Sequence, residues 1–399
     1  MKKPNPYHLP GAPGLTCHLS TPKVTMGHGA LSQLGALPGG RIALVLDAYL
    51  MDSPLLQTLT GQTLAGQEYR IICGVKDEPS FAAIDPYIPV IREFAPTQIV
   101  AIGGGSTMDT AKALWAFYER PELTWDTLTG GTPLPAFPGK AVLIAVPTTS
   151  GTGAEATGAA VYKRYDGTKA LLIDGAIRPG QVFLDFDLLS SLPKKVVANA
   201  GVDALAHVIG AMSVESANPM DKMICTQVAL SILQNLPRSY LTADPQARDM
   251  MHVCAYLAGD EINNAGGGLE HKLDMFAKAY HIPHGEIIGI FLPYTMLYLL
   301  PENHYLPLAE QLGIPGGSPE EKQRALVGRI WEMYDLLGMP KTIRDAGVPE
   351  QEFLDKLPEY IEMVKAIGHI YWIRGFRGDD SLRDLYLQAY YGINEEDLK

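Results

Sequence analysis

"QIVAIGGGSTMDTAK", residues 98 to 112, decides how the first half of this chain folds. The segment begins with apolar, partly β-branched residues, passes through three consecutive glycines at 103–105, and continues with residues that suit a helix. Glycines let backbone amides approach a ligand closely, and the amino end of a following helix favours a phosphate group. The segment therefore predicts a strand, a tight turn and a helix, with the turn as a candidate phosphate-binding site.

Further apolar runs of strand length occur on both sides of this segment, at 42–47, 71–75, 141–147, 170–174 and 181–185. Stretches that suit helices separate several of them, which is typical of a parallel sheet covered on both faces. From about residue 190 onward, apolar residues recur mainly at helical spacing. We therefore predict two domains, an α/β domain with a parallel sheet over 1–190 and an all-helical domain over 191–399.

The composition is that of an ordinary globular chain, with 399 residues, 47% hydrophobic residues and a formal net charge of −12. This negative charge argues against nucleic acids and anionic membranes as partners and favours a small-molecule ligand. The four cysteines are scattered without a metal-binding spacing, and residues 1–14 contain no apolar signal segment. We therefore expect a cytoplasmic protein with free thiols.

A second loop of small residues, "VPTTSGTGAEAT" at 146–157, directly follows a strand. Its hydroxyl groups can bind a ligand without adding charge, although the pattern also suits an ordinary polar loop. Asp47 ends the strand at 42–47, where a carboxylate can bind an adenosine ribose or simply cap a turn. Both loops and Asp47 lie at carboxyl ends of strands, which is where open α/β sheets bind ligands.

Carboxylates and histidines of the second half are candidate metal ligands. Asp203 and His207 are four residues apart, so a helix would present them on one face, although an ordinary hydrogen-bonded pair has the same spacing. Further candidates follow in "GGLEHKLDMFAKAYHIPHG" at 267–285. Two imidazoles and two carboxylates suit zinc or ferrous iron. The predicted ligand set is Asp203, His207, Glu270 and His284.

Taken together, "GGGSTMDTAK", "PTTSGTGAEAT", "GVDALAH" followed by "ANP", and "YHIPHG" resemble motifs of the iron-containing (group III) alcohol dehydrogenases, in that family's order. The resemblance implies a dinucleotide-binding α/β domain and a helical domain, an architecture shared with the dehydroquinate synthases. It implies NAD and a divalent metal, Fe²⁺ or Zn²⁺, as cofactors. The implied reaction is metal-assisted hydride transfer between NAD(H) and a small alcohol, aldehyde or ketone, in a homodimer or larger homo-oligomer.

By position, the resemblance also assigns the cofactor contacts. The glycine-rich turn would hold the pyrophosphate, the second loop would lie along the nicotinamide half, and Asp47 would favour NAD over NADP. The residues expected at or close to the cofactor are Asp47, Gly104, Gly105, Ser106, Asp109, Thr148, Thr149, Thr157 and Lys169.

The family's metal pattern is matched only in part. The family usually has Asp, a His four residues later, a H-x-x-x-H segment and the His of "PHG"; the aspartate and the first and last histidines are present here. Counted back from "YHIPHG" without a gap, the third ligand is Glu270, and Asp274 takes the place of the second histidine of the segment. His271 becomes the ligand only if a gap is inserted. We predict Glu270 as the ligand, and Asp274 as the catalytic residue that relays a proton or binds a substrate hydroxyl.

Two other functions remain open from the sequence. A dehydroquinate synthase-like lyase acts on a phosphorylated substrate and calls for clustered basic residues, whereas 260–290 offers only Lys272 and Lys278 among acids. If Glu270 and Asp274 mark a degenerate metal site, the protein would instead be a metal-free reductase or a non-catalytic nucleotide-binding relative.

Overall fold

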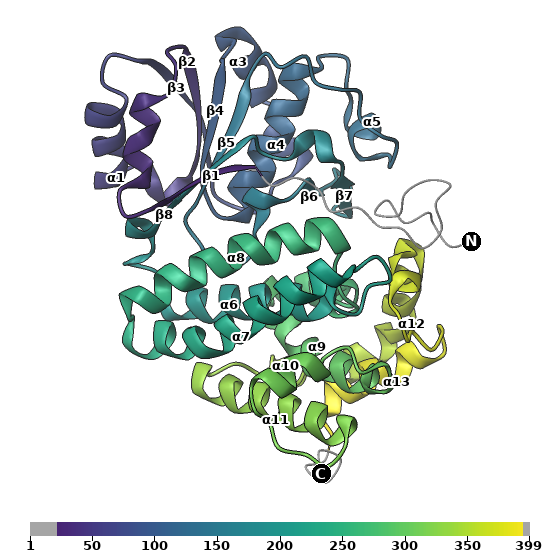
Figure 1. Ribbon diagram of the computed structural model, residues 1–399. Coiled ribbons are helices and arrows are strands. Elements are labelled where there is room, and N and C mark those ends of the chain that lie inside the picture. Colours follow the sequence, from purple (N-terminus) through teal and green to yellow (C-terminus); the bar gives the residue numbers. More distant parts are fainter. Residues whose placement is uncertain (1–21, 394–399) are drawn as a thin grey trace. The chain divides into compact units, whose positions relative to one another are not determined.

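The computed structural model describes residues 22–393, which divide into two compact units (Figure 1). One unit ends at Ser191 and the other begins at Leu192. The stretch 1–14, from which we expect no signal peptide, and Cys17 lie outside the described residues. Among the helices of the described residues, none has the length and apolar character that a membrane crossing requires.

The N-terminal unit is built on a parallel sheet, as predicted. Its six described strands follow the order β1-β8-β5-β4-β2-β3, and each neighbouring pair is parallel. The central strands are buried almost throughout, which explains why they read as continuous apolar runs. The strands are β1 (Lys23–Gly27), β2 (Arg41–Asp47), β3 (Glu68–Val75), β4 (Gln98–Gly103), β5 (Val142–Pro147) and β8 (Gln181–Asp185).

Helices cover both faces of this sheet (Figure 1). On one face, alternate residues of β2, β4 and β5 pack against leucines of the 3-10 helix Ala30–Ala36 and of α1 (Pro54–Thr58). The other face carries α4 (Gly105–Glu119), which packs against β4 and β5. The remaining helices of this unit are α2 (Phe81–Ile84), α3 (Tyr87–Phe94) and α5 (Trp125–Thr129).

One expected strand lies outside the parallel sheet. The run at 170–174 forms β7 (Lys169–Ile173), which pairs antiparallel with β6 (Ala159–Lys163) in a separate two-stranded sheet. The connection from β6 to β7 spans only 164–168. This is far shorter than the crossover of a dozen or more residues that a parallel pair needs. The strands β1 and β6 were not predicted, because neither carries a continuous apolar run.

The C-terminal unit is helical, as predicted, and all its long elements among the described residues are helices. The sequence marks several of the helix starts. Asn218 and Asp221 form a capping box at the beginning of α7, with Pro219 at its first position. The helices are α6 (Lys194–Ala211), α7 (Pro219–Thr242), α8 (Pro245–Ala265), α9 (His284–Tyr298), α10 (Leu306–Gln311), α11 (Pro319–Leu337), α12 (Glu350–Ile367) and α13 (Ser381–Tyr391).

Candidate metal and cofactor sites

The helix α6 carries the first two candidate metal ligands. Asp203 and His207 lie one turn apart on its buried side, and their neighbours in the helix are fully buried apolar residues. The Nε2 atom of His207 is 3.7 Å from Oδ1 of Asp203. The four-residue spacing therefore places both side chains together, as the sequence indicated.

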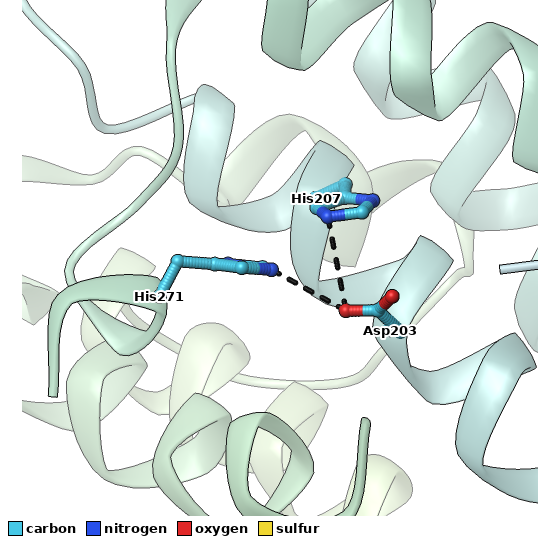
Figure 2. A group of neighbouring side chains, drawn as sticks. All are labelled: Asp203, His207 and His271. Carbon is cyan, nitrogen blue, oxygen red and sulfur yellow. Dashed lines mark hydrogen bonds and ion pairs between the residues drawn. The ribbon is translucent and has the colours of Figure 1, made fainter. Parts of the chain in front are cut away.

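Two further histidines approach the same carboxylate oxygen from other segments. Nε2 of His271 is 3.4 Å from Oδ1 of Asp203, and Nε2 of His284 is 3.6 Å from it. Figure 2 shows Asp203 and His207 on one helix and His271 reaching the same oxygen from a separate segment. Three imidazole nitrogens thus surround one carboxylate oxygen.

These distances fit a metal site better than a network of direct hydrogen bonds. Bonds of about 2.0–2.2 Å from a tetrahedral metal to nitrogen and oxygen put neighbouring donors about 3.3–3.6 Å apart. The observed separations of 3.4, 3.6 and 3.7 Å are close to that spacing. They are longer than the usual N–H···O distance of about 2.7–3.2 Å. Asp203, His207 and His271 therefore form a compact donor set suited to zinc or ferrous iron, and His284, which reaches only the oxygen of Asp203 at this spacing, is the fourth candidate.

The protonation of these groups follows from burial and from their mutual charges. Burial opposes the charge of Asp203, but the neighbouring histidines outweigh this effect and hold its pKa well below the usual range. Burial lowers the pKa of His207 to about 3, so this imidazole is neutral at pH 7 and can offer a lone pair. Burial also disfavours a charge on His271, but the neighbouring carboxylates of Asp203 and Glu270 raise its pKa to about 9. A metal bound through Nε2 of His271 would displace that proton.

Glu270 does not join this group, although ungapped counting made it the predicted third ligand. Its Oε1 lies 2.9 Å from Nδ1 of His271, whose other ring nitrogen faces Asp203. The reason is local geometry: Glu270–Lys272 is a 3-10 turn, in which consecutive side chains point about 120° apart. Only one of the two neighbours can face Asp203, and we therefore replace Glu270 by His271 in the candidate ligand set.

Asp274, the predicted catalytic residue, also contacts a histidine. Its Oδ2 lies 3.1 Å from Nδ1 of His284, while Nε2 of the same ring faces Asp203. The carboxylate is buried at the beginning of the 3-10 helix Asp274–Tyr280. This geometry favours a role that acts through His284 over direct contact with a substrate.

Small residues of α9 allow His284 to come this close to α6. A Cβ atom on Gly285 would lie 2.0 Å from the backbone oxygen of Asn199, and one on Gly289 would lie 2.7 Å from Cγ1 of Val202. Both contacted residues belong to α6. The two helices are therefore packed backbone against backbone at the end of α9 that carries His284.

In the N-terminal unit, the two predicted cofactor loops lie side by side. The strands that precede them are neighbours, with Gly103 opposite Pro147, and the amide of Thr148 donates to the oxygen of Gly103 at 3.0 Å. A Cβ on Gly104 would be 3.5 Å from Oγ1 of Thr149, and one on Gly103 would be 3.0 Å from Cβ of Asp47. The structure thus brings both loops and Asp47 to one edge of the sheet.

The glycine-rich turn leads directly into α4. Gly104 precedes the helix as its N-cap and provides no side chain to cap it, and Gly105 and Ser106 are its first two residues. The first amides of a helix point along its axis and carry a partial positive charge. This end of α4 therefore suits a phosphate group.

Three other predicted cofactor residues, Asp109, Thr157 and Lys169, lie outside the two loops' contact with each other. Oδ2 of Asp109 accepts a hydrogen bond from the amide of Val161 at 2.9 Å, and Thr157 accepts one from Nζ of Lys112 at 3.2 Å. Lys169 begins strand β7. Asp109 and Thr157 thus help to hold β6 beside α4, and their contact with the cofactor, like that of Lys169, stays a prediction.

Lys112 was not singled out from the sequence, although it is fully buried and central to these contacts. Its Nζ also donates to the oxygen of Ala159 at 2.6 Å. Burial lowers its pKa to about 8, and burial raises the pKa of Asp109 to about 6, while the charge of each partner opposes the shift. The signal in the sequence was the spacing of Asp109 and Lys112, which places them on one face of α4.

Comparison with known proteins gives matches over both units. The family model described as iron-containing alcohol dehydrogenase matches residues 21–186. The model for the C-terminal part of the Fe-containing alcohol dehydrogenase family matches residues 197–364.

Individual relatives match over nearly their whole length. An NADPH-dependent butanol dehydrogenase from Clostridium saccharobutylicum is 33% identical, over 92% of this chain and 96% of the relative. An alcohol dehydrogenase from Thermococcus barophilus is 32% identical, over 92% of this chain and 98% of the relative. The solved structure of an iron-containing alcohol dehydrogenase from Thermococcus thioreducens has a TM-score of 0.83 at 30% identity, and the match covers 93% of this chain and 99% of that one.

Proposed function

Because the chain belongs to the iron-containing alcohol dehydrogenase family, and so interconverts an alcohol and its aldehyde or ketone by hydride transfer, we infer which of its residues serve this reaction. We propose that it uses NAD(H) and one divalent cation, iron or zinc. The observation that carries the proposal is the convergence of three Nε2 atoms on Oδ1 of Asp203. The proposed ligands are Asp203, His207, His271 and His284.

Each of these residues has a definite task in the proposal. The carboxylate of Asp203 supplies a negative charge to the site, and its low pKa keeps that charge at neutral pH. His207, His271 and His284 direct Nε2 toward it. A cation held there would act as a Lewis acid, polarising the substrate carbonyl and stabilising the negative charge that develops on its oxygen. Bound NADH would supply the hydride for the carbonyl carbon, and a proton from solvent would complete the alcohol.

Family membership favours this reaction over the lyase alternative. A metal-free reductase and a non-catalytic relative remain outcomes of the test. The purified protein is assayed for oxidation of NADH with a panel of small aldehydes, and its metal content is measured. We expect one divalent metal per chain, loss of at least about 100-fold in activity after chelation, and recovery with Fe²⁺ or Zn²⁺. Full activity after complete removal of metal would contradict the proposed metal site, and no turnover of any aldehyde would contradict the proposed reaction.

For the cofactor, we propose that Asp47 selects NAD. Two observations support this proposal: Asp47 ends β2, and it lies close to the glycine-rich turn. In open α/β folds an adenosine ribose binds at this place. A carboxylate there would accept a hydrogen bond from the ribose hydroxyls and repel a 2′-phosphate. The relative from Clostridium saccharobutylicum is named as NADPH-dependent, so cofactor choice varies among the similar proteins.

Replacement of Asp47 by serine is expected to raise the ratio of kcat/KM for NADPH to that for NADH by about 10–100-fold, because a repulsion of about 1.4–2.7 kcal/mol is removed. Serine can still cap the turn that Asp47 caps through the amide of Tyr49. Steady-state kinetics with both cofactors measures the ratio. Asp52→Ser, a change at an exposed acid of the following turn, is the control and should leave the ratio unchanged.

We also propose a cytoplasmic homo-oligomer. The described cysteines Cys73, Cys225 and Cys254 are all free, which suits a reducing compartment. The β6–β7 sheet exposes Val161, Leu171 and Ile173 on one face, and such apolar surface is typical of contacts between subunits. Sedimentation velocity would measure the assembly, and a monomer at micromolar concentration would contradict it.

A further inference from the structure

Two buried carboxylates, Glu270 and Asp274, lie behind two of the proposed ligand histidines, on the sides of the rings that face away from Asp203. We propose that they are positioning residues: each accepts a hydrogen bond from the Nδ1–H of one histidine, His271 or His284, and so holds its Nε2 toward Asp203. This inference rests on the proposed metal site. It assigns a role to the two acidic residues that ungapped counting places at the family's histidine positions.

The contact of Glu270 is built into the surrounding backbone. Its side chain is 3% exposed, and Oε1 lies 2.9 Å from Nδ1 of His271. Two glycines make room for this carboxylate: a Cβ on Gly210 would lie 2.1 Å from Oε1, and one on Gly268 would lie 2.3 Å from it. Gly210 belongs to α6, the helix that carries Asp203. The helix α6 therefore provides the proposed ligand Asp203 and also the space for the carboxylate of Glu270, which lies behind the proposed ligand His271.

The backbone that carries Glu270 is fixed as well. The buried ammonium group of Lys272 donates to the oxygen of Gly268 at 3.1 Å and to that of Gly267. These hydrogen bonds close the turn around the carboxylate. They also place a positive charge near Glu270, which offsets part of the cost of burying a carboxylate.

The contact of Asp274 orients a histidine that is only half buried. The side chain of His284 is 48% exposed, whereas that of Asp274 is 7% exposed. Oδ2 of Asp274 lies 3.1 Å from Nδ1 of His284. The neighbouring backbone is anchored, since the hydroxyl of Tyr386 donates to the oxygen of Leu273 at 2.8 Å. A fixed carboxylate thus determines the direction of a half-exposed imidazole.

Both contacts follow a general rule of metal sites. A ligand histidine donates its second ring N–H to a carboxylate or carbonyl, which fixes the ring and makes the coordinating nitrogen more basic; loss of such a partner costs about 10–100-fold in metal affinity or activity. The two contacts act on separate histidines, but both rings face the same oxygen of Asp203, so the effects of the two carboxylates are expected to be coupled.

The test measures the affinity for Zn²⁺ by competition with a chelator of known affinity. Glu270→Gln and Asp274→Asn keep the size of each side chain and remove its charge, while Glu270→Ala and Asp274→Ala also remove the acceptor. We expect Zn²⁺ affinity to fall by about 10-fold in the first pair and about 100-fold in the second. The control is Glu286→Gln, which removes a carboxylate of the first turn of α9 that pairs with Lys195. It should bind Zn²⁺ as the unaltered protein does.

A second measurement separates positioning from general damage to the fold. The Nδ1–H protons of His271 and His284 are observed by NMR in protein labelled with ¹⁵N-histidine. In the unaltered protein both are expected downfield and in slow exchange, and each alanine variant should lose only the proton of its own histidine. Unchanged Zn²⁺ affinity together with unchanged Nδ1–H protons would overturn the inference. Failure of the unaltered protein to bind Zn²⁺ or Fe²⁺ would overturn the proposed metal site, and the Nδ1–H protons of the metal-free protein would then still decide whether the carboxylates hold the rings.

Discussion

Replacing His271 by alanine is expected to lower kcat/KM for aldehyde reduction by about 1000-fold. The structure places Nε2 of His271 3.4 Å from Oδ1 of Asp203, closer than either of the other two histidines. Without this nitrogen the cation would keep fewer protein ligands, and its contribution to the transition state would be lost. If that contribution is about 4 kcal/mol, the loss corresponds to about three orders of magnitude.

The same measurement on Glu270→Ala separates the two alignments of this segment. In our assignment Glu270 supports His271 and binds no metal itself, so Glu270→Ala should regain most of its activity when Zn²⁺ or Fe²⁺ is in excess. His271→Ala should not regain activity at any metal concentration. The reverse pattern, an active His271→Ala and an inactive Glu270→Ala, would restore the ungapped assignment. His281→Asn is a suitable control, because His281 is exposed and has a positive φ of 56°, a conformation that asparagine tolerates.

Replacing Gly285 by alanine is expected to destabilise the protein by about 1–3 kcal/mol and to weaken metal binding at the same time. The added Cβ would lie 2.0 Å from the backbone oxygen of Asn199 and 2.7 Å from its carbon. These are backbone atoms of α6, so no side chain can turn aside to relieve the overlap. The helix α9 must move away, and His284, the residue before Gly285, must move with it.

Urea unfolding measures the change in the free energy of unfolding, and chelator competition measures Zn²⁺ affinity. The matched control is Gly328→Ala on α11, where a Cβ would meet nothing within 4 Å. That change should stabilise the protein by about 0.5–1 kcal/mol, because alanine loses less backbone entropy in a helix than glycine does. If Gly285→Ala were as stable as the unaltered protein, the close packing of α9 against α6 would not depend on the missing side chain at position 285.

Much of the fold could be predicted because its signals are local. The strands β4 and β5 are buried almost along their whole length, and this burial requires the continuous apolar runs at 98–104 and 141–147. Which strand a given strand pairs with is harder to predict from such local signals. The run at 170–174 was recognised as a strand, but its antiparallel pairing with β6 depends on a short connection and on a neighbour without a clear apolar run.

The candidate sites divide in the same way. The four-residue spacing of Asp203 and His207 determines their common orientation, since both lie in one regular helix and its period fixes which residues share a face. The choice between Glu270 and His271 depends on the tertiary structure. They are neighbours in a single 3-10 turn, where a shift of one residue rotates the side chain by about a third of a turn. Only the packing of that turn against Gly210 and Gly268 decides that the carboxylate faces the glycines and the imidazole faces Asp203.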